Sequence, residues 1–139
     1  MVRHNTFVSH FNNLAPEIIV NAGHSFPVDW WSFGILIYEM LFSNPPFYNK
    51  DHEKMFNDIK NRPLFFDESK VQISKEAKDL ITGLLRKNPD ERLGTKSHKE
   101  IRNHPWFSDI NFEHLLEKKY VPEYIPKVGG DIDVSNFDE

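Results

Sequence analysis

Three charged residues of this 139-residue chain adjoin or interrupt apolar sequence, and they are the first candidates for chemistry. Glu17 and Arg92 each adjoin apolar residues, and Glu39 interrupts the apolar run over 30–42. An unpaired charge is costly to bury, so pairing Glu17 with Arg92 is the economical arrangement if both are buried. The alternative is that they are two unrelated surface charges. Glu39 is either an exposed helix position or a residue that contacts a ligand.

Metal-dependent and hydrolytic chemistry find no support in the residue pattern. The chain has no cysteine, which excludes thiolate metal sites and disulfides. No serine lies in a GxSxG nucleophile turn. The seven histidines follow no HExxH or paired spacing: His4, His10, His24, His52, His98, His104 and His114. We therefore expect no metal site.

Helices are the elements that must position these residues. Pro27 and Asp29 suit a helix start, and ten apolar residues follow between Trp30 and Phe42. A helix that is apolar on every side must be covered on every side. A second helix is expected after Asn49 or Asp51. A third, capped by Ser74, is indicated by the spacing of Ala77, Leu80, Ile81, Leu84 and Leu85.

Shorter elements are expected before and after these three helices. One helical turn is predicted at 16–19, and a capped turn closed by Gly94 at 88–94. Ser97 and Glu100 match a capping box that starts a short helix, and a last short helix is predicted over 112–118. No strand is strongly indicated, so the predicted fold is mainly α with an irregular tail.

Charge and hydropathy limit the partners of the chain. The net charge of −4 is carried by residues 120–139, which hold five acidic residues and one lysine. No basic stripe is present, so nucleic acid is not an expected partner. The apolar run 30–42 is too short to span a bilayer. A chain without cysteine suits a reducing compartment, and we expect a cytoplasmic or nuclear location.

An ordered series of short motifs resembles the C-terminal half of the large lobe of AGC serine/threonine protein kinases, such as protein kinases A and B. The series begins with the triplet that closes a kinase activation segment and ends in a segment similar to the AGC C-terminal extension. In order, the motifs are Ala15-Pro16-Glu17, Val28-Asp29-Trp30-Trp31-Ser32-Phe33-Gly34, Arg92-Leu93-Gly94, His104-Pro105-Trp106-Phe107, Tyr124-Ile125-Pro126-Lys127 and Ser135-Asn136-Phe137-Asp138. The resemblance implies a partial kinase domain over 1–107 and a truncated extension over 108–139.

The resemblance also implies roles for single residues. Glu17 and Arg92 match an ion pair that ties the activation segment to the helices, and Asp29 matches a residue that holds the catalytic loop. Because that loop is absent here, we favour a structural role for Asp29. Glu39 matches a glutamate that binds basic substrate residues. Thr6 aligns with the phosphorylated threonine of the activation loop, although an ordinary loop threonine is a nearly equal alternative. The structural motif residues are Ala15, Pro16, Glu17, Asp29, Gly34 and Arg92.

The catalytic parts of a kinase are missing from these 139 residues. Phosphoryl transfer needs a glycine-rich loop, a lysine on the phosphates, a catalytic-loop aspartate and metal ligands. None of the corresponding motifs occurs, so we expect no catalytic, cofactor or metal residue here, and ATP and Mg²⁺ only in a complete family member. His10 and Asn12 also replace a threonine and a glutamate of the family, which argues against activity.

Three interpretations of the function follow. The chain is a piece of a serine/threonine kinase, a non-catalytic module that binds a protein partner, or a decaying duplicate. The partner is a protein substrate, another protein, or the missing kinase half. Because the helix over 30–42 is apolar on every side, we predict that the isolated chain exposes an apolar patch and aggregates or needs a partner.

Overall fold

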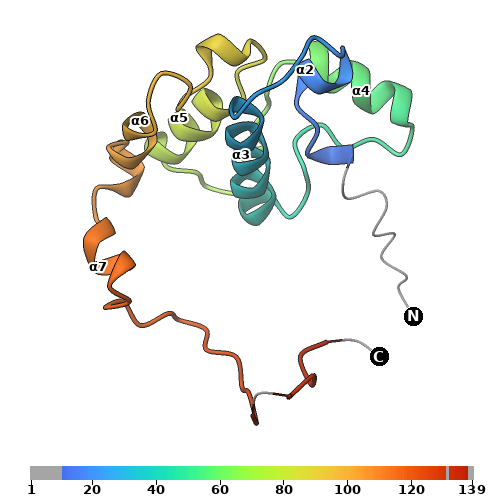
Figure 1. Cartoon of the computed structure of the whole chain (residues 1–139). Coiled ribbons are helices and arrows are strands. Elements are labelled where there is room, and N and C mark those ends of the chain that lie inside the picture. The colour runs from blue at the N-terminus through green and yellow to red at the C-terminus, as the bar shows by residue number, and fades with distance from the viewer. Residues whose placement is uncertain (1–10, 131, 138–139) are drawn as a thin grey trace. The chain divides into compact units, whose positions relative to one another are not determined.

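The computed structural model describes residues 11–130 and 132–137. Residue contacts divide the chain into two units, Met1–Ser108 and Asp109–Glu139. The described residues form α-helices, 3-10 helices and connecting segments, without a strand (Figure 1). The predicted mainly α fold is therefore confirmed.

Helix α3 (Pro27–Phe42) is the longest element and forms the centre of the first unit. Pro27 occupies its first turn, where a missing N–H costs no hydrogen bond, and Asp29 lies near the positive end of the helix dipole. The helix ends at Ser43, which adopts a left-handed conformation with φ of 62°. These are the boundaries that the sequence predicts.

Two amphipathic helices follow, each with a side-chain cap at its start. Asp51 accepts hydrogen bonds from two backbone amides at the start of α4 (His52–Asn61). Ser74 Oγ accepts one from Ala77 N, at 3.1 Å, at the start of α5 (Lys75–Leu84). Both helices begin where the polar cap residues place them, because a cap satisfies amides that have no partner inside the helix.

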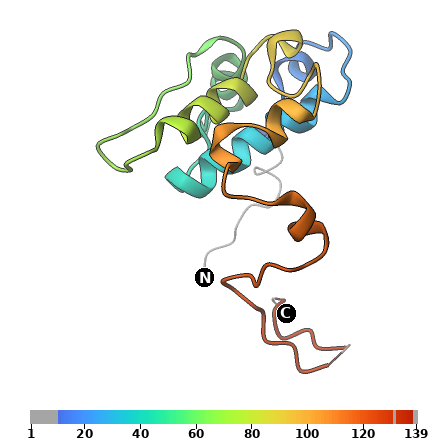
Figure 2. The same cartoon turned by 90° about the vertical axis from the view of Figure 1, so that its left-hand side faces the viewer.

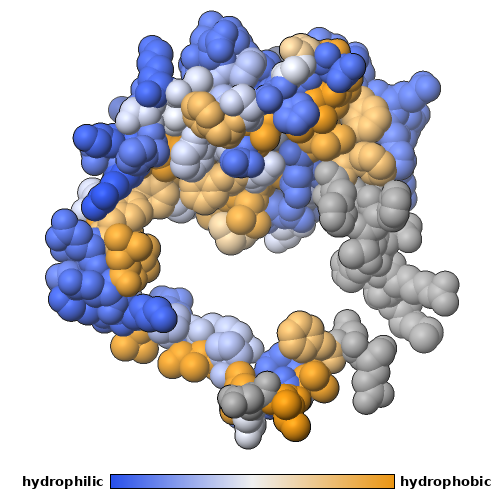
Figure 3. Space-filling model, in the orientation of Figure 1, coloured by the Kyte–Doolittle hydropathy of each residue, from blue (hydrophilic) through white to orange (hydrophobic). Residues whose placement is uncertain are grey.

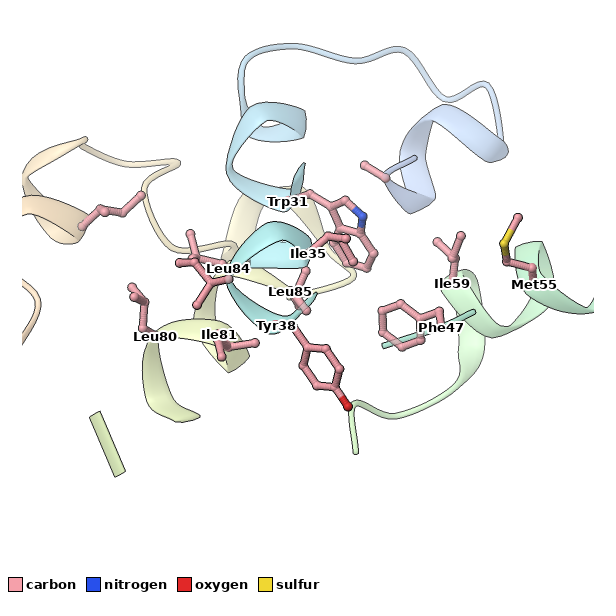
Figure 4. Packing of buried hydrophobic residues seen from close by; sticks show 13 residues of the cluster. Trp31, Ile35, Tyr38, Phe47, Met55, Ile59, Leu80, Ile81, Leu84 and Leu85 are labelled. Atoms are coloured by element: carbon pink, nitrogen blue, oxygen red, sulfur yellow. The ribbon is translucent and has the colours of Figure 1, made fainter. Parts of the chain in front are cut away.

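The core forms where α5 packs against α3, and the two helices lie side by side in Figures 1 and 2. One buried cluster contains Ile35 of α3 with Leu80 and Leu84 of α5, and Trp31 of α3 stacks on Phe47 within the same cluster (Figure 4). Gly34 permits this approach, since a Cβ there would lie 2.9 Å from Leu84 Cβ. The close fit of the two helices therefore depends on a residue without a side chain.

The segment after α5 is a series of tight turns. Asn88 Oδ1 caps the 3-10 helix η1 (Pro89–Glu91) by accepting from Asp90 N. Gly94 follows with φ of +92°, a conformation that favours glycine. Leu93 N donates to Gly83 O at 2.9 Å, which ties the turns to the end of α5. The predicted capped turn closed by Gly94 is confirmed.

The predicted capping box at 97–100 is wrong. Helix α6 (Lys99–Arg102) begins after His98, and Ser97 Oγ accepts from Lys99 N rather than from Glu100 N. Glu100 Oε2 instead accepts from Gly94 N at 3.0 Å. The amide of a left-handed glycine in the preceding turn competes successfully for this carboxylate. The 3-10 helix η2 (Pro105–Phe107) closes the first unit.

The second unit contains one short helix, α7 (Phe112–Leu116), and an irregular segment. Asn111 Oδ1 caps α7, which ends two residues earlier than the sequence predicts. Farther on, Asp133 accepts hydrogen bonds from the amides of Gly129 and Ser135, which lower the pKa of its carboxyl to about 2. Among the described residues, no helix is long and apolar enough to cross a membrane.

Candidate functional site

A buried ion pair joins two segments that are 75 residues apart in the sequence. Arg92 Nη1 donates to Glu17 Oε1 at 2.6 Å, and Arg92 Nη2 donates to Glu17 Oε2 at 2.9 Å. Arg92 retains only 1% of its accessible surface, and Glu17 retains 7%. The two parallel bonds use the planar fork of guanidinium, which a lysine cannot reproduce.

The remaining donors of Arg92 bind backbone carbonyls of two more segments. Nη1 also donates to Pro27 O at 2.8 Å, and Nε donates to Arg86 O at 3.1 Å. The guanidinium lies 5.2 Å from the ring centre of Trp31, within cation–π range. One side chain thus connects α2 (Pro16–Ile19), the start of α3 and the end of α5.

The ionised form of Glu17 is favoured despite its burial. Burial opposes the charge and is the largest single influence, but the hydrogen bond from Arg92, a backbone amide and the guanidinium charge together outweigh it. The pKa of Glu17 is therefore below its ordinary value of 4.5. Pro16 at the first position of α2 and buried Ala15 before it fix the backbone that carries this carboxylate.

Ala15 and Pro16 lie beside Glu17, and the remaining predicted site residues lie on α3 or outside the described residues. Asp29 and Glu39 are both exposed on α3, near its start and near its end, respectively. Gly34 lies at the contact between α3 and α5. Thr6 lies outside the described residues. The structure thus brings Glu17 and Arg92 together but gathers no cluster with Asp29 or Glu39.

The segment just before α2 packs on α4. Phe11 lies 6.0 Å from Phe56 and 5.2 Å from His52 between ring centres. Asn13 O accepts a hydrogen bond from Ser32 Oγ of α3 at 3.3 Å. Asn12 Oδ1 is buried and has no hydrogen-bond partner among the described atoms. This is the position at which asparagine replaces the expected glutamate, and it leaves a polar atom unsatisfied.

The polar contacts of half-buried Lys87 and buried His104 were not anticipated from the sequence. Lys87 Nζ donates to Ile59 O at the end of α4 and lies 3.6 Å from the ring centre of Phe47. Burial lowers the pKa of Lys87 to about 8. His104 Nδ1 accepts from Trp106 N, and its Nε2 lies 3.2 Å from Asp79 Oδ2. Neither Lys87 nor His104 lies in a catalytic sequence motif. Their contacts form only when segments that are distant in the sequence meet in the folded unit.

No group of three or more potential metal ligands occurs within 11–130 and 132–137. The arrangement is a charge-stabilised junction between helices. This junction holds α2 in a fixed position against the start of α3.

A protein-family model described as the protein kinase domain matches residues 2–107. The chain belongs to the protein kinase family. The matched region of this kinase chain contains the Glu17–Arg92 pair and the helices α2 to α6. The helical architecture fits the helical part of a kinase large lobe, as the sequence motifs indicate.

The individual relatives are serine/threonine kinases. The chain is 45% identical over 134 residues to the serine/threonine-protein kinase YPK1 of Saccharomyces cerevisiae. The aligned residues make up 96% of this chain and 19% of the relative. It is 43% identical to the serine/threonine-protein kinase gad8 of Schizosaccharomyces pombe, over 98% of this chain and 23% of the relative. It is 40% identical to Sgk1 of Xenopus tropicalis, over 96% and 31%, respectively.

These matches confirm the likeness to AGC serine/threonine kinases. This kinase chain spans 19–31% of the length of the three relatives.

Proposed function

We propose that the chain is the substrate-docking, helical part of a serine/threonine protein kinase and does not transfer phosphate by itself. Residues 1–107 are the partial kinase domain, and residues 108–139 correspond to the AGC C-terminal extension. ATP and Mg²⁺ are held by the complementary kinase half, because the 139 residues lack the nucleotide and metal motifs.

The bidentate pair of Glu17 and Arg92 is the observation that carries this proposal. Arg92 also binds Pro27 O, so the triplet that closes the activation segment is fixed to the start of α3. Because the activation segment is fixed at its closing triplet, it can hold a bound substrate in one orientation toward a catalytic centre. Such positioning is the contribution that a helical lobe makes to phosphoryl transfer.

Single residues receive proposed roles on this basis. Exposed Glu39 contacts basic residues of a protein substrate, since its carboxylate is available on the surface of α3. Asp29 supports the start of α3, and Thr6 is a site of activating phosphorylation. The cytoplasm, or the nucleus, is the proposed location, where protein substrates of such a kinase are accessible.

A chimera with the yeast relative tests the proposal. The 134 matched residues of YPK1 are replaced by those of this chain, and phosphorylation of a basic peptide is measured. The chimera is expected to bind ATP but to transfer phosphate slowly, since His10 and Asn12 replace the family's threonine and glutamate. Changing His10→Thr together with Asn12→Glu is expected to raise the rate roughly tenfold or more, equivalent to about 1.4 kcal/mol.

Two further variants of the restored chimera make the test specific. Glu39→Gln is expected to raise KM for a basic peptide more than KM for a peptide without basic residues, because one charge-assisted contact is lost. Glu53→Gln, at an exposed position on α4, is the matched control. If the restored chimera folds and binds ATP but transfers no phosphate, the proposal is wrong.

A second candidate function is a non-catalytic module that binds a protein partner. The unsatisfied Asn12 Oδ1 favours it, because this polar atom lies in the segment where the sequence departs from active kinases. This version predicts that the chain is stable and that ATP with Mg²⁺ leaves its melting temperature unchanged. A nucleotide-dependent rise in melting temperature excludes it.

A further inference from the structure

A pocket of about 300 Å³ lies between the start of α3 and the turn that leads into α6. Aromatic side chains of Phe26 and Trp30 line one part of it, and Lys96, Ser97 and His98 line another. Phe26 is more than half exposed, although it is aromatic. The pocket thus combines flat apolar walls with polar groups from a single loop.

Gly94 shapes this pocket by letting the indole of Trp30 lie against the backbone. A Cβ on Gly94 would lie 2.7 Å from Trp30 Nε1 and 2.6 Å from Ile101 Cδ1. The indole N–H of Trp30 is buried and has no acceptor among the described atoms. A buried donor without a partner is uncommon in folded proteins and gains stability when an acceptor becomes available.

The polar groups of the pocket are donors. The side chains of Lys96 and His98 are exposed and have neither an ion-pair nor a hydrogen-bond partner among the described residues. Ser97 Oγ accepts from Lys99 N, which leaves its own hydrogen available. None of the described residues that line the pocket carries a carboxylate. The nearby Glu100 is held by Gly94 N outside the pocket lining.

We propose that this pocket binds a carboxylate attached to an aromatic or other flat apolar group. Lys96 supplies one positive charge, which matches the single charge of a carboxylate better than the double charge of a phosphate monoester. Ser97 and one ring nitrogen of His98 donate to the carboxylate oxygens, and Phe26 and Trp30 pack against the flat group. The site takes either a free aromatic acid or an acidic residue beside an aromatic one in a peptide.

Binding is tested by NMR titration of the full ¹⁵N-labelled chain with sodium benzoate, with the peptide acetyl-Phe-Glu-amide, and with phenyl phosphate. The indole N–H signal of Trp30 is assigned from a Trp30→Phe variant. Benzoate or the peptide is expected to shift this signal and the Ser97 amide signal to saturation. Benzyl alcohol, which has the ring without the charge, is expected to bind at least threefold more weakly.

Two lysine variants localise the effect. Lys96→Gln is expected to weaken binding at least threefold, whereas Lys99→Gln, on α6 and outside the pocket lining, is expected to change it less than twofold. Tighter binding of the peptide identifies a protein source, and tighter binding of benzoate a free acid; both support the proposal. The proposal is overturned if neither carboxylate shifts these signals at 10 mM, roughly the weakest affinity of specific interest, or if phenyl phosphate binds more tightly than both.

Discussion

At the scale of single residues, the Arg92 side chain joins three segments of the first unit. Its four hydrogen bonds reach Glu17, Pro27 and Arg86, and its guanidinium faces Trp31. Removing the guanidinium would leave the Glu17 carboxylate buried without its counter-ion. The cost of such an orphaned charge exceeds the net value of the pair itself.

Replacing Arg92 by alanine is therefore expected to lower the free energy of unfolding by about 3–5 kcal/mol. Urea denaturation followed by circular dichroism measures this change. Lys54→Ala is the control, because Lys54 forms an exposed ion pair with Asp51 at 3.9 Å, a class of contact that contributes about 0–1 kcal/mol. Equal midpoints for the parent chain and Arg92→Ala would contradict the structural role of the pair.

The same pair predicts how stability depends on acid. Because the pKa of Glu17 is lower in the folded state, its stabilising contribution is complete above about pH 4.5 and is lost as the pH falls through the folded pKa. In Glu17→Gln this contribution is absent at every pH. The difference in unfolding free energy between parent and variant is expected to shrink below pH 4.5, and a constant difference between pH 6 and pH 3 would count against the ion pair.

At the scale of elements, the contact of α3 with α5 determines the shape of the core. Gly34→Ala would place a methyl group 2.9 Å from Leu84 Cβ, an atom that cannot rotate away. The better helix propensity of alanine offsets only part of this overpacking. We expect a loss of about 1–2 kcal/mol in thermal unfolding.

Gly130→Ala is the matched control for this substitution, because nothing lies within 4 Å of the added methyl group. Its melting temperature is expected to equal that of the parent chain. If Gly34→Ala were as stable as Gly130→Ala, the two helices would have to pack less closely than the structure shows.

Local sequence signals were sufficient to predict most helix boundaries and insufficient for contacts between turns. Asp51, Ser74 and Asn88 cap the elements that they precede, because capping depends only on neighbouring amides. Glu100 satisfied the local rule for a capping box but binds the amide of Gly94 instead. That amide becomes available only after the chain has turned, which no local pattern reveals.

The candidate site was only partly accessible from the sequence for the same reason. The pairing of Glu17 with Arg92 could be anticipated because two charges beside apolar residues need partners and because the motifs resemble a kinase. Lys87 over Phe47, and the pocket at Trp30, depend on segments that meet only in the folded unit.

At the scale of the molecule, the first unit presents apolar side chains on the helix at its centre. Leu36 and Met40 of α3 are 52% and 66% exposed, and apolar side chains reach the surface in the region of α3 (Figure 3). The two residues are four positions apart and therefore lie on one helix face. This arrangement agrees with the expectation that the helix over 30–42 needs a cover.

Charging this face is expected to reduce self-association of the isolated chain. The double variant Leu36→Lys with Met40→Lys should elute closer to the monomer volume in gel filtration and bind less of a hydrophobic dye, since it interrupts the apolar surface. Asn57→Lys on α4, which adds charge at an exposed polar position, serves as the control. A parent chain that is already a monomer without dye binding would contradict the expectation.

Under the proposed function, these 139 residues position a substrate but contain no phosphoryl-transfer centre. The most direct test incubates the purified chain with Mg²⁺ and γ-labelled ATP and a basic peptide, beside an Arg92→Ala preparation from the same expression and purification. We expect no transfer above the level found with the variant. Transfer by the parent chain that persists through repeated purification and disappears in Arg92→Ala would contradict the claim.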